Sequence, residues 1–199
     1  MKIWLITSGE PIPINDQRPH RTGILSKMFA ETGNQITWWS TTFDHQMKQY
    51  LYEDDAEVEI NENLKIIFLH SCTKYHKNIS LKRIKNHREV SVKFEKKAKK
   101  KSVPDLIFCS FPTIDLAYAS VLYAKEKKVP VIIDVRDLWP DIFVNPFPDI
   151  FKPVIKLGLF KYFRKTKYIF KNACAITAVS NEYLQFGLNY ACRKKTKMD

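Results

Sequence analysis

Short apolar runs alternate along the chain with segments in which apolar residues recur at helical spacing. Runs typical of strands cover residues 3–7, 35–41, 58–60, 64–69, 105–109, 130–135 and 174–179. Segments typical of helices cover residues 22–32, 44–51, 80–101, 113–127, 151–171 and 181–190. Gly33 follows the first helical segment, where a glycine commonly ends a helix. The polar residues 61–63, between two strand-like runs, predict a hairpin.

Strands that are separated by helices predict βαβ units and a parallel sheet. The runs at 106–109 and 131–133 are apolar at every position, as strands covered on both faces require. The predicted fold class is α/β, a single Rossmann-like, doubly wound, mainly parallel sheet with helices on both faces. We expect residues 1–190 to form this domain and residues 191–199 to begin an interdomain linker or to mark the end of the chain.

Ligands of such sheets bind at the carboxyl ends of the strands, which directs attention first to the loop after the first strand. This loop carries Arg18, His20 and Arg21 close to Gly23, at the start of a predicted helix. Helix N-terminal amides beside a glycine admit a phosphate closely, and guanidinium groups bind phosphate through paired hydrogen bonds. The same residues fit a solvated loop with a helix cap equally well, and a nicotinamide or flavin fingerprint is absent.

A second candidate site follows the strand at 130–135. Arg136 and Asp137 leave this strand at its carboxyl end, and Trp139-Pro140 then stops the strand from continuing. Asp137 is a candidate general base for a hydroxyl, and Arg136 a candidate partner for a substrate phosphate. Without further information, a structural Arg–Asp pair at the strand end is the more economical interpretation of these two residues.

The charge balance suggests an anionic partner, because 33 Lys and Arg against 21 Asp and Glu give a net charge of +12. Residues 80–101 hold ten basic side chains, and residues 150–181 hold no acidic one but many aromatic and aliphatic ones. A helix of the second kind can lie in an anionic membrane interface. It can equally be an ordinary helix with its apolar side on the sheet and its lysines in water.

Several other classes of protein are disfavoured. The five histidines show no spacing typical of a zinc site, and neither a serine-hydrolase elbow nor a phosphate-binding P-loop is present. Cys109 and Cys174 lie in apolar runs and are predicted to be buried thiols of a reducing compartment. With too short an apolar N-terminus for a signal peptide and no run approaching about 20 apolar residues, we expect a cytoplasmic protein.

Taken together, the motifs resemble the N-terminal domain of glycosyltransferase family 4, which comprises retaining enzymes of GT-B architecture. The likeness is closest to bacterial members that build cell-surface polysaccharides, and it extends over essentially the whole chain. It rests on the opening strand at 2–7, on Arg21-Thr22-Gly23 leading into the first helix, and on the segment 32–40. It also rests on residues 104–107, 131–140 and 175–180, in that order and spacing.

The resemblance implies site residues and substrates. It implies a nucleotide sugar as substrate with no cofactor and no catalytic metal, and it places Gly23 and Arg21 near the donor diphosphate. Glu10, Arg18 and His20 would hold the acceptor. Many members carry His-Asp where this chain has Arg136-Asp137, so the aspartate matches and the histidine does not.

The resemblance also implies partners and a location. The acceptor is expected to be a lipid-linked or other saccharide in capsule, O-antigen or exopolysaccharide synthesis. The family's C-terminal donor-binding domain is missing from these 199 residues, so the chain alone is expected to be inactive. The Lys/Arg-rich helices would bind the anionic cytoplasmic face of the inner membrane. We expect no nucleic-acid partner, although a non-catalytic basic module that binds membrane or nucleic acid remains the alternative.

Overall fold

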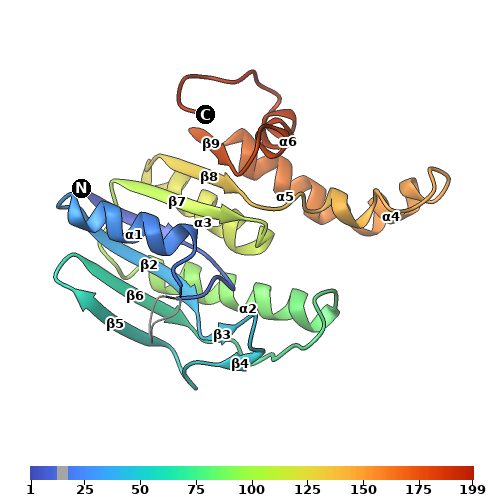
Figure 1. The fold of residues 1–199 in the computed structure, drawn as a ribbon. Helices are drawn as coiled ribbons and strands as arrows, with labels where there is room; N and C mark the ends of the chain where they lie inside the picture. Colours follow the sequence, from blue (N-terminus) through green and yellow to red (C-terminus); the bar gives the residue numbers. More distant parts are fainter. Residues whose placement is uncertain (13–17) are drawn as a thin grey trace.

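The computed structural model describes residues 1–12 and 18–199, which form an α/β fold around one large sheet (Figure 1). The sheet has seven strands in the order β5-β6-β2-β1-β7-β8-β9, all parallel except for the antiparallel edge strand β5. The strands are β1 (Lys2–Ile6), β2 (Gln35–Thr41), β5 (Ala56–Asn61), β6 (Leu64–Leu69), β7 (Leu106–Phe111), β8 (Val131–Val135) and β9 (Ala175–Ala178). This arrangement confirms the predicted fold class, and the hairpin expected around residues 61–63 joins β5 to β6.

The order of the strands reverses direction at β1. From β1 the chain adds β2 and β6 on one side, then returns to add β7, β8 and β9 on the other side. The loops that follow β1 and β7 therefore leave the sheet in opposite directions. The gap between them is the place where open α/β sheets bind ligands.

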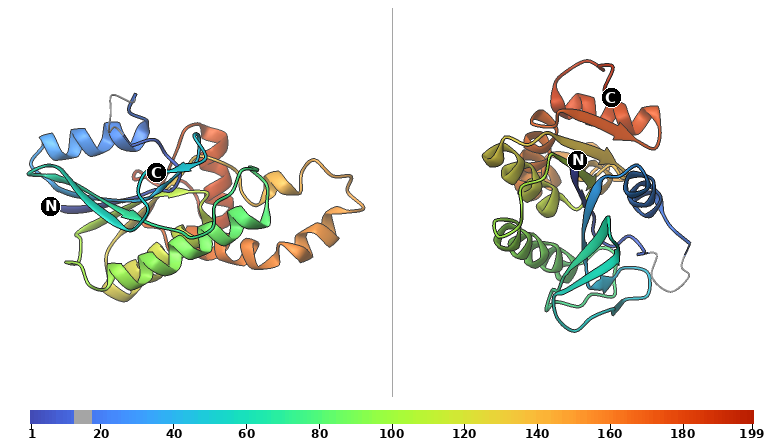
Figure 2. Two further views of the ribbon diagram at one scale, coloured as in Figure 1. Left: turned by 90° about the horizontal axis from the view of Figure 1, so that it is seen from below. Right: turned by 90° about the vertical axis from the view of Figure 1, so that its left-hand side faces the viewer.

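Helices cover the two faces of the sheet unequally, as the right-hand view of Figure 2 shows. On one face α1 (Arg21–Glu31) is the only helix among residues 1–12 and 18–199, and it packs through Leu25, Phe29 and Ala30. The other face carries α2 (Leu81–Ala98), α3 (Ile114–Lys127), α5 (Phe160–Lys171) and α6 (Asn181–Ala191). α4 (Lys152–Gly158) and a short 3-10 turn, Asp141–Phe143, lie between β8 and α5.

An aromatic cluster fills the core between β1, β2 and the helices α2 and α3. The ring of Trp4 stacks on Tyr123 with 5.0 Å between ring centroids and meets Trp39 edge-on at the same distance. Phe94 of α2 packs edge-on against Trp39, with 5.1 Å between the centroids. Large rings held in these orientations supply much of the apolar burial that fixes the two helices on the sheet.

Residues 44–51, predicted to be helical, instead form a small hairpin of β3 (Phe43–Asp44) and β4 (Gln49–Tyr50). The Asp44 carboxylate accepts hydrogen bonds from the backbone amides of residues 46 and 47, at 2.7 and 2.8 Å. Lys48 then adopts a φ of +56°, which a helix does not accommodate. The helical prediction for this segment was wrong, because an aspartate turn competed successfully with helix formation.

The long helix predicted over residues 151–171 is two helices, α4 and α5, separated at Leu159. The second of these two helices, α5, buries Thr166, Ile169 and Phe170 against the core. None of the side chains of α4 is buried, and Figure 1 shows α4 projecting away from the body of the fold. The interpretation as an ordinary packed helix therefore holds for α5 and fails for α4.

The cysteine predictions were half right. Cys109, on β7, is fully buried, and burial raises the pKa of its thiol to about 12. Cys174 is exposed, because it precedes the edge strand β9. Within residues 1–12 and 18–199, no helix has the length and apolar character needed to cross a membrane.

The contact between α6 and β9 depends on the absence of a side chain at Gly187. A Cβ atom there would lie 2.9 Å from Ile176 Cγ2 and 3.1 Å from a ring carbon of Phe170. We expect Gly187→Ala to be less stable than Gly158→Ala by about 1–3 kcal/mol, measured by urea denaturation. Both substitutions gain helix propensity, but a Cβ on Gly158 meets nothing within 4 Å, so the difference isolates the steric clash. Equal stability of the two variants would contradict the tight packing.

Candidate functional site

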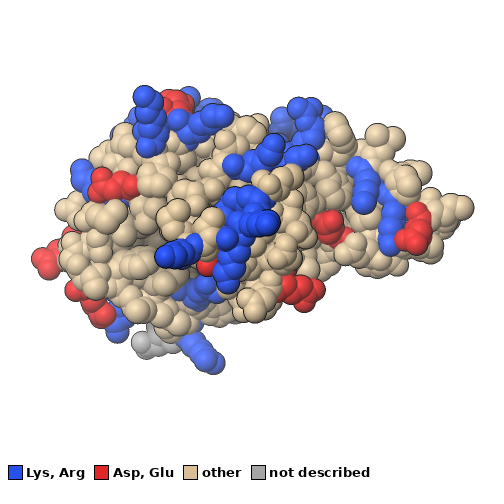
Figure 3. Space-filling view, turned by 90° about the horizontal axis from the view of Figure 1, so that it is seen from above, with Lys and Arg blue, Asp and Glu red and all other residues tan. Residues whose placement is uncertain are grey.

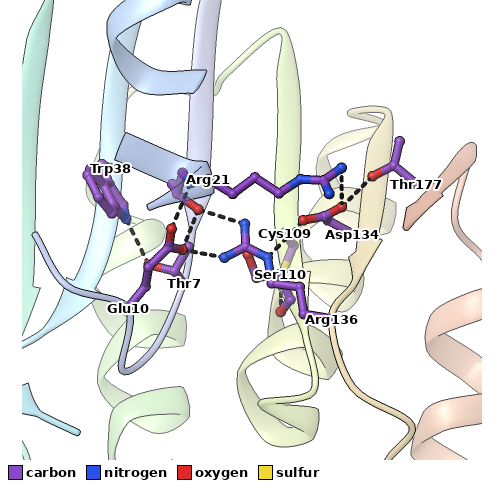
Figure 4. A network of polar contacts seen from close by, with 10 residues as sticks. Thr7, Glu10, Arg21, Trp38, Cys109, Ser110, Asp134, Arg136 and Thr177 are labelled. Carbon is purple, nitrogen blue, oxygen red and sulfur yellow. Dashed lines mark hydrogen bonds and ion pairs between the residues drawn. The ribbon is translucent and has the colours of Figure 1, made fainter. Parts of the chain in front are cut away.

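A buried carboxylate organises the carboxyl end of the sheet. Asp134 lies on β8 with a side chain that is 0% exposed. It accepts a hydrogen bond from the Thr177 hydroxyl of β9 at 2.8 Å and one from Arg136 Nε at 2.8 Å, and it pairs with Arg21 Nη2 at 3.1 Å. Figure 4 shows these groups converging from three elements. Two arginines and a hydroxyl therefore compensate the burial of the charge of Asp134.

A second carboxylate, Glu10, continues the network to the first helix (Figure 4). Glu10 follows β1 and accepts hydrogen bonds from the Thr22 amide at 2.7 Å and from the Thr22 hydroxyl at 2.6 Å. It therefore caps α1 from a distant position, since His20 at the helix start forms no side-chain cap. Arg136 pairs with Glu10 and donates a further hydrogen bond to the Thr22 hydroxyl at 2.8 Å.

The network balances its own charges, with two guanidinium groups facing two carboxylates. Burial alone would lower the pKa of Arg136, but the Glu10 and Asp134 carboxylates outweigh burial, and the pKa is raised. The side chain of Arg136 is 20% exposed and that of Arg21 is 38% exposed. Arg21 is therefore the cation of this network that is best placed to meet an incoming anion.

The other residues predicted for the phosphate or the acceptor lie around α1. Gly23 is buried in the first turn, where its carbonyl accepts a hydrogen bond from the Ser26 hydroxyl at 2.8 Å. Arg18 and His20 are exposed and line an open hollow together with Arg21. The neighbouring loop residues 13–17 lie outside the described part of the chain. The roles predicted for these side chains remain predictions.

Asp137 lies apart from the network formed by Arg136. Its carboxylate accepts hydrogen bonds from the backbone amide of Leu138 at 2.8 Å and from the indole of Trp139 at 3.1 Å. Arg136 instead pairs with Asp134 and Glu10, so the simple Arg136–Asp137 pair considered from the sequence is not formed. The two hydrogen bonds from Leu138 and Trp139 hold the Asp137 carboxylate in place. Because Asp137 is half-buried, solvent still reaches this residue.

A cluster of bases that the sequence did not single out adjoins Asp137. The guanidinium of Arg83, on α2, lies 4.8 Å from the centre of the Trp139 ring. Burial, reinforced by Arg83, lowers the pKa of His87 to about 3 and that of His45 to about 4. Both imidazoles are therefore neutral at neutral pH. The positive charges of this cluster are Arg83 and Lys48, whose ammonium group lies 3.3 Å from His45 Nδ1.

Sequence reasoning missed two residues on which these sites depend. Asp134 was read only as part of an apolar strand, although an acidic residue inside a run buried on both faces signals a compensated charge. Arg83 was one of ten basic residues in a single segment, and nothing in that segment distinguishes it from its neighbours. Among the described residues, no group of three or more His, Cys, Asp or Glu side chains is arranged to hold a metal ion.

Comparison with known proteins shows similarity of fold without detectable similarity of sequence. No protein-family model matches the chain, and no curated protein matches it. A solved structure of sucrose-phosphate synthase from Thermosynechococcus elongatus is similar to this chain, with a TM-score of 0.57 and 13% identity. The match covers 92% of this chain and 78% of the chain of that structure. A second structure of that enzyme matches 88% of this chain with a TM-score of 0.60 and 13% identity.

This chain spans 41% of the length of the second structure. At 13% identity the likeness shows the fold alone: this chain has the same Rossmann-like α/β fold as the matched part of that enzyme.

The buried network generates a prediction about stability. Asp134→Asn removes the charge that holds Arg21 and Arg136, and breaking a buried ion pair typically costs about 3–5 kcal/mol. We expect a loss of this size in urea denaturation, whereas Asp137→Asn, at a half-buried carboxylate, should change stability by less than about 1 kcal/mol. Similar losses for the two variants would show that Asp134 does not hold the sheet edge as argued.

Proposed function

We propose that this chain is the acceptor-side half of a glycosyltransferase, which transfers a sugar from a nucleotide diphosphate donor to a hydroxyl group with retention. The observation that carries the proposal is the position of Asp137, a held and half-buried carboxylate at the carboxyl end of β8. This strand pairs with β7, which lies at the strand-order reversal of a GT-B-like sheet. In this proposal Asp137 orients the acceptor hydroxyl or accepts its proton. A second α/β half, as in the resemblance to family 4, would bind most of the donor.

The charged network supports a role next to the donor phosphates. Arg21 offers the more exposed guanidinium at the N-terminal end of α1, close to Gly23. Helix amides and a guanidinium group together favour a phosphate at this place. Arg136 is already held by Glu10 and Asp134, so we assign it the task of fixing the position of α1 and β8. This assignment replaces direct contact with phosphate as its main role.

We further propose that α4 binds an anionic membrane surface, which fits a lipid-linked acceptor in cell-surface polysaccharide synthesis. Five apolar side chains in and around this helix are 53–79% exposed, namely Ile150, Phe151, Val154, Leu157 and Phe160. Basic residues accompany them, and Lys156, Lys161 and Arg164 have no acidic partner within 4 Å among the described residues. Exposed apolar side chains interleaved with unpaired cations are the composition of an interfacial helix.

Charge elsewhere in the molecule bears on the choice between a membrane and a nucleic acid. Several lysines in or just after α2 are paired, because Lys93 and Lys97 contact Asp55, and Lys101 contacts Glu57. On the face seen in Figure 3, basic side chains gather in a band across the middle, with separate groups to either side. A basic band attracts either kind of anionic partner, so the choice of a membrane rests on the exposed apolar side chains around α4.

The glycosyltransferase proposal is tested by a donor screen combined with one substitution. The protein at its natural length is incubated with labelled nucleotide sugars and membrane extract, and transfer of label is measured. We expect Asp137→Asn to lower turnover by at least about tenfold, or 1.4 kcal/mol of barrier, with little change in melting temperature. Absence of transfer from every donor, or normal turnover by the variant, would contradict the proposal or the role of Asp137, respectively.

The membrane proposal is tested by sedimentation with liposomes. We expect binding to anionic vesicles to fall as salt rises, because exposed charges are screened within about 8 Å at physiological ionic strength. Leu157→Gln should weaken binding by about tenfold or more, since full burial of a leucine is worth about 1.5–3 kcal/mol. Met28→Gln, on the exposed side of α1, is the matched control and should bind normally. Equal binding to neutral vesicles, or no effect of Leu157→Gln, would leave α4 without this role.

A further inference from the structure

An apolar cavity of about 220 Å³ lies at the carboxyl end of the sheet, outside the network around Asp134. Its walls come from the N-terminal ends of α2 and α3, from the loop after β8, and from the junction of α4 and α5. The apolar lining includes Ile79, Ile84, Ile114, Trp139, Phe143 and Tyr162. Ile79 is 75% exposed, so one part of the wall is open to solvent, whereas Ile114 is 3% exposed and forms a buried part of the wall.

One wall of this cavity carries a positive charge without an acidic partner. Arg83 donates hydrogen bonds to the Asn78 carbonyl at 2.7 Å and to His87 Nε2 at 3.4 Å, and it lies over the Trp139 ring. Among the described residues, no carboxylate lies within 4 Å of its guanidinium group. A partly buried guanidinium whose hydrogen-bond partners are neutral retains the capacity to bind an anion.

The acidic groups nearby do not neutralise this charge. Asp115 is the acidic residue among those lining the cavity, and it is paired with Lys165. The negative charge of Asp137 attracts Arg83 electrostatically and acts to raise the pKa of its guanidinium group. The hydrogen bonds that the Asp137 carboxylate accepts nevertheless come from Leu138 and Trp139. His87 is buried beside Arg83 and neutral at neutral pH, so it adds no charge that would repel or attract a ligand.

We propose that this cavity binds the first part of an aliphatic chain that carries a phosphate, with the phosphate on Arg83 and the chain among the apolar side chains. The match is chemical on both sides, since an apolar cavity removes the chain from water and a guanidinium group binds a phosphate through two hydrogen bonds. The inference rests on the proposed function in one respect, because such a ligand is the anchor of a lipid-linked acceptor. Asp137, beside Arg83, would then lie close to the sugar that such an anchor carries.

The position of the cavity relative to α4 fits the same ligand. Leu159, which ends α4 and begins α5, lines the cavity, and the exposed apolar side chains of α4 precede it directly. A lipid that leaves a membrane at α4 would therefore meet Leu159 and the apolar wall of the cavity that also carries Arg83. This continuity favours a lipid phosphate over a water-soluble phosphate.

The inference is tested by titration calorimetry with decyl phosphate below its micelle-forming concentration, with decanol and inorganic phosphate as comparison ligands. We expect decyl phosphate to bind at least about tenfold more tightly than either, a difference of 1.4 kcal/mol. Arg83→Gln should remove this advantage while leaving the binding of decanol unchanged. Lys82→Gln, an exposed neighbour on α2 outside the cavity, removes the same charge and should behave as the unchanged protein.

A second variant tests the apolar wall and keeps the inference testable if Arg83→Gln does not fold. Ile84→Gln, at a side chain that is 38% exposed and lines the cavity, should weaken both decyl phosphate and decanol. Circular dichroism and melting temperature establish that each variant is folded. Equal affinity for decyl phosphate and decanol, or equal losses in Arg83→Gln and Lys82→Gln, would overturn the inference. Tight binding of inorganic phosphate alone would identify a site for soluble phosphate instead.

The outcome is separable from that of the glycosyltransferase proposal. If decyl phosphate binds through Arg83 but no donor sugar is transferred, the lipid site stands and the enzymatic proposal fails. If sugar is transferred but decyl phosphate does not bind, the acceptor is held elsewhere and this inference fails.

Discussion

The carboxyl edge of this fold depends on one compensated charge, the buried carboxylate of Asp134. Its partners come from different parts of the chain, because Arg21 begins α1, Arg136 follows β8, and Thr177 lies on β9. A carboxylate removed from water is costly unless it is paired, so these elements have to meet for any of them to be placed. Through Arg136 the same constraint reaches Glu10, and with it the cap of the only helix on that face among the described residues.

The ion pairs of Arg136 also separate it from its neighbour in the sequence, Asp137, so that the two residues belong to different regions of the structure. Arg136 turns toward the face that α1 covers, and Asp137 is held by the Trp139 indole beside α2. One region is electrically balanced and rigidly connected, and the other combines an apolar cavity, neutral imidazoles and the unpaired Arg83. In the proposals made for these regions, the first holds the sheet edge and offers Arg21 to the donor phosphates, and the second receives the acceptor.

The strands could be predicted from the sequence because burial on both faces makes each of them a continuous apolar run, as at 106–109 and 131–133. The predictions failed where a local interaction competes with periodicity, as in the Asp44 turn, or where periodicity continues through a break, as at Leu159. The rule for parallel sheets directed the search to the carboxyl edge of the sheet, where the structure places Arg21, Arg136 and Asp137. Its pairings depend on which sheet face each side chain takes, and that information lies in contacts between residues as distant as Glu10 and Arg136.

The unburied helix α4 has a consequence for the protein in free solution. Its aliphatic and aromatic side chains keep apolar area in contact with water, at a standing cost of about 25 cal/mol for each Å². Any apolar surface relieves this cost, including the same helix on a second molecule. The segment that suits a lipid interface is therefore also the segment through which concentrated protein would self-associate. Its lysines, by mutual repulsion, are what oppose such clustering at low ionic strength.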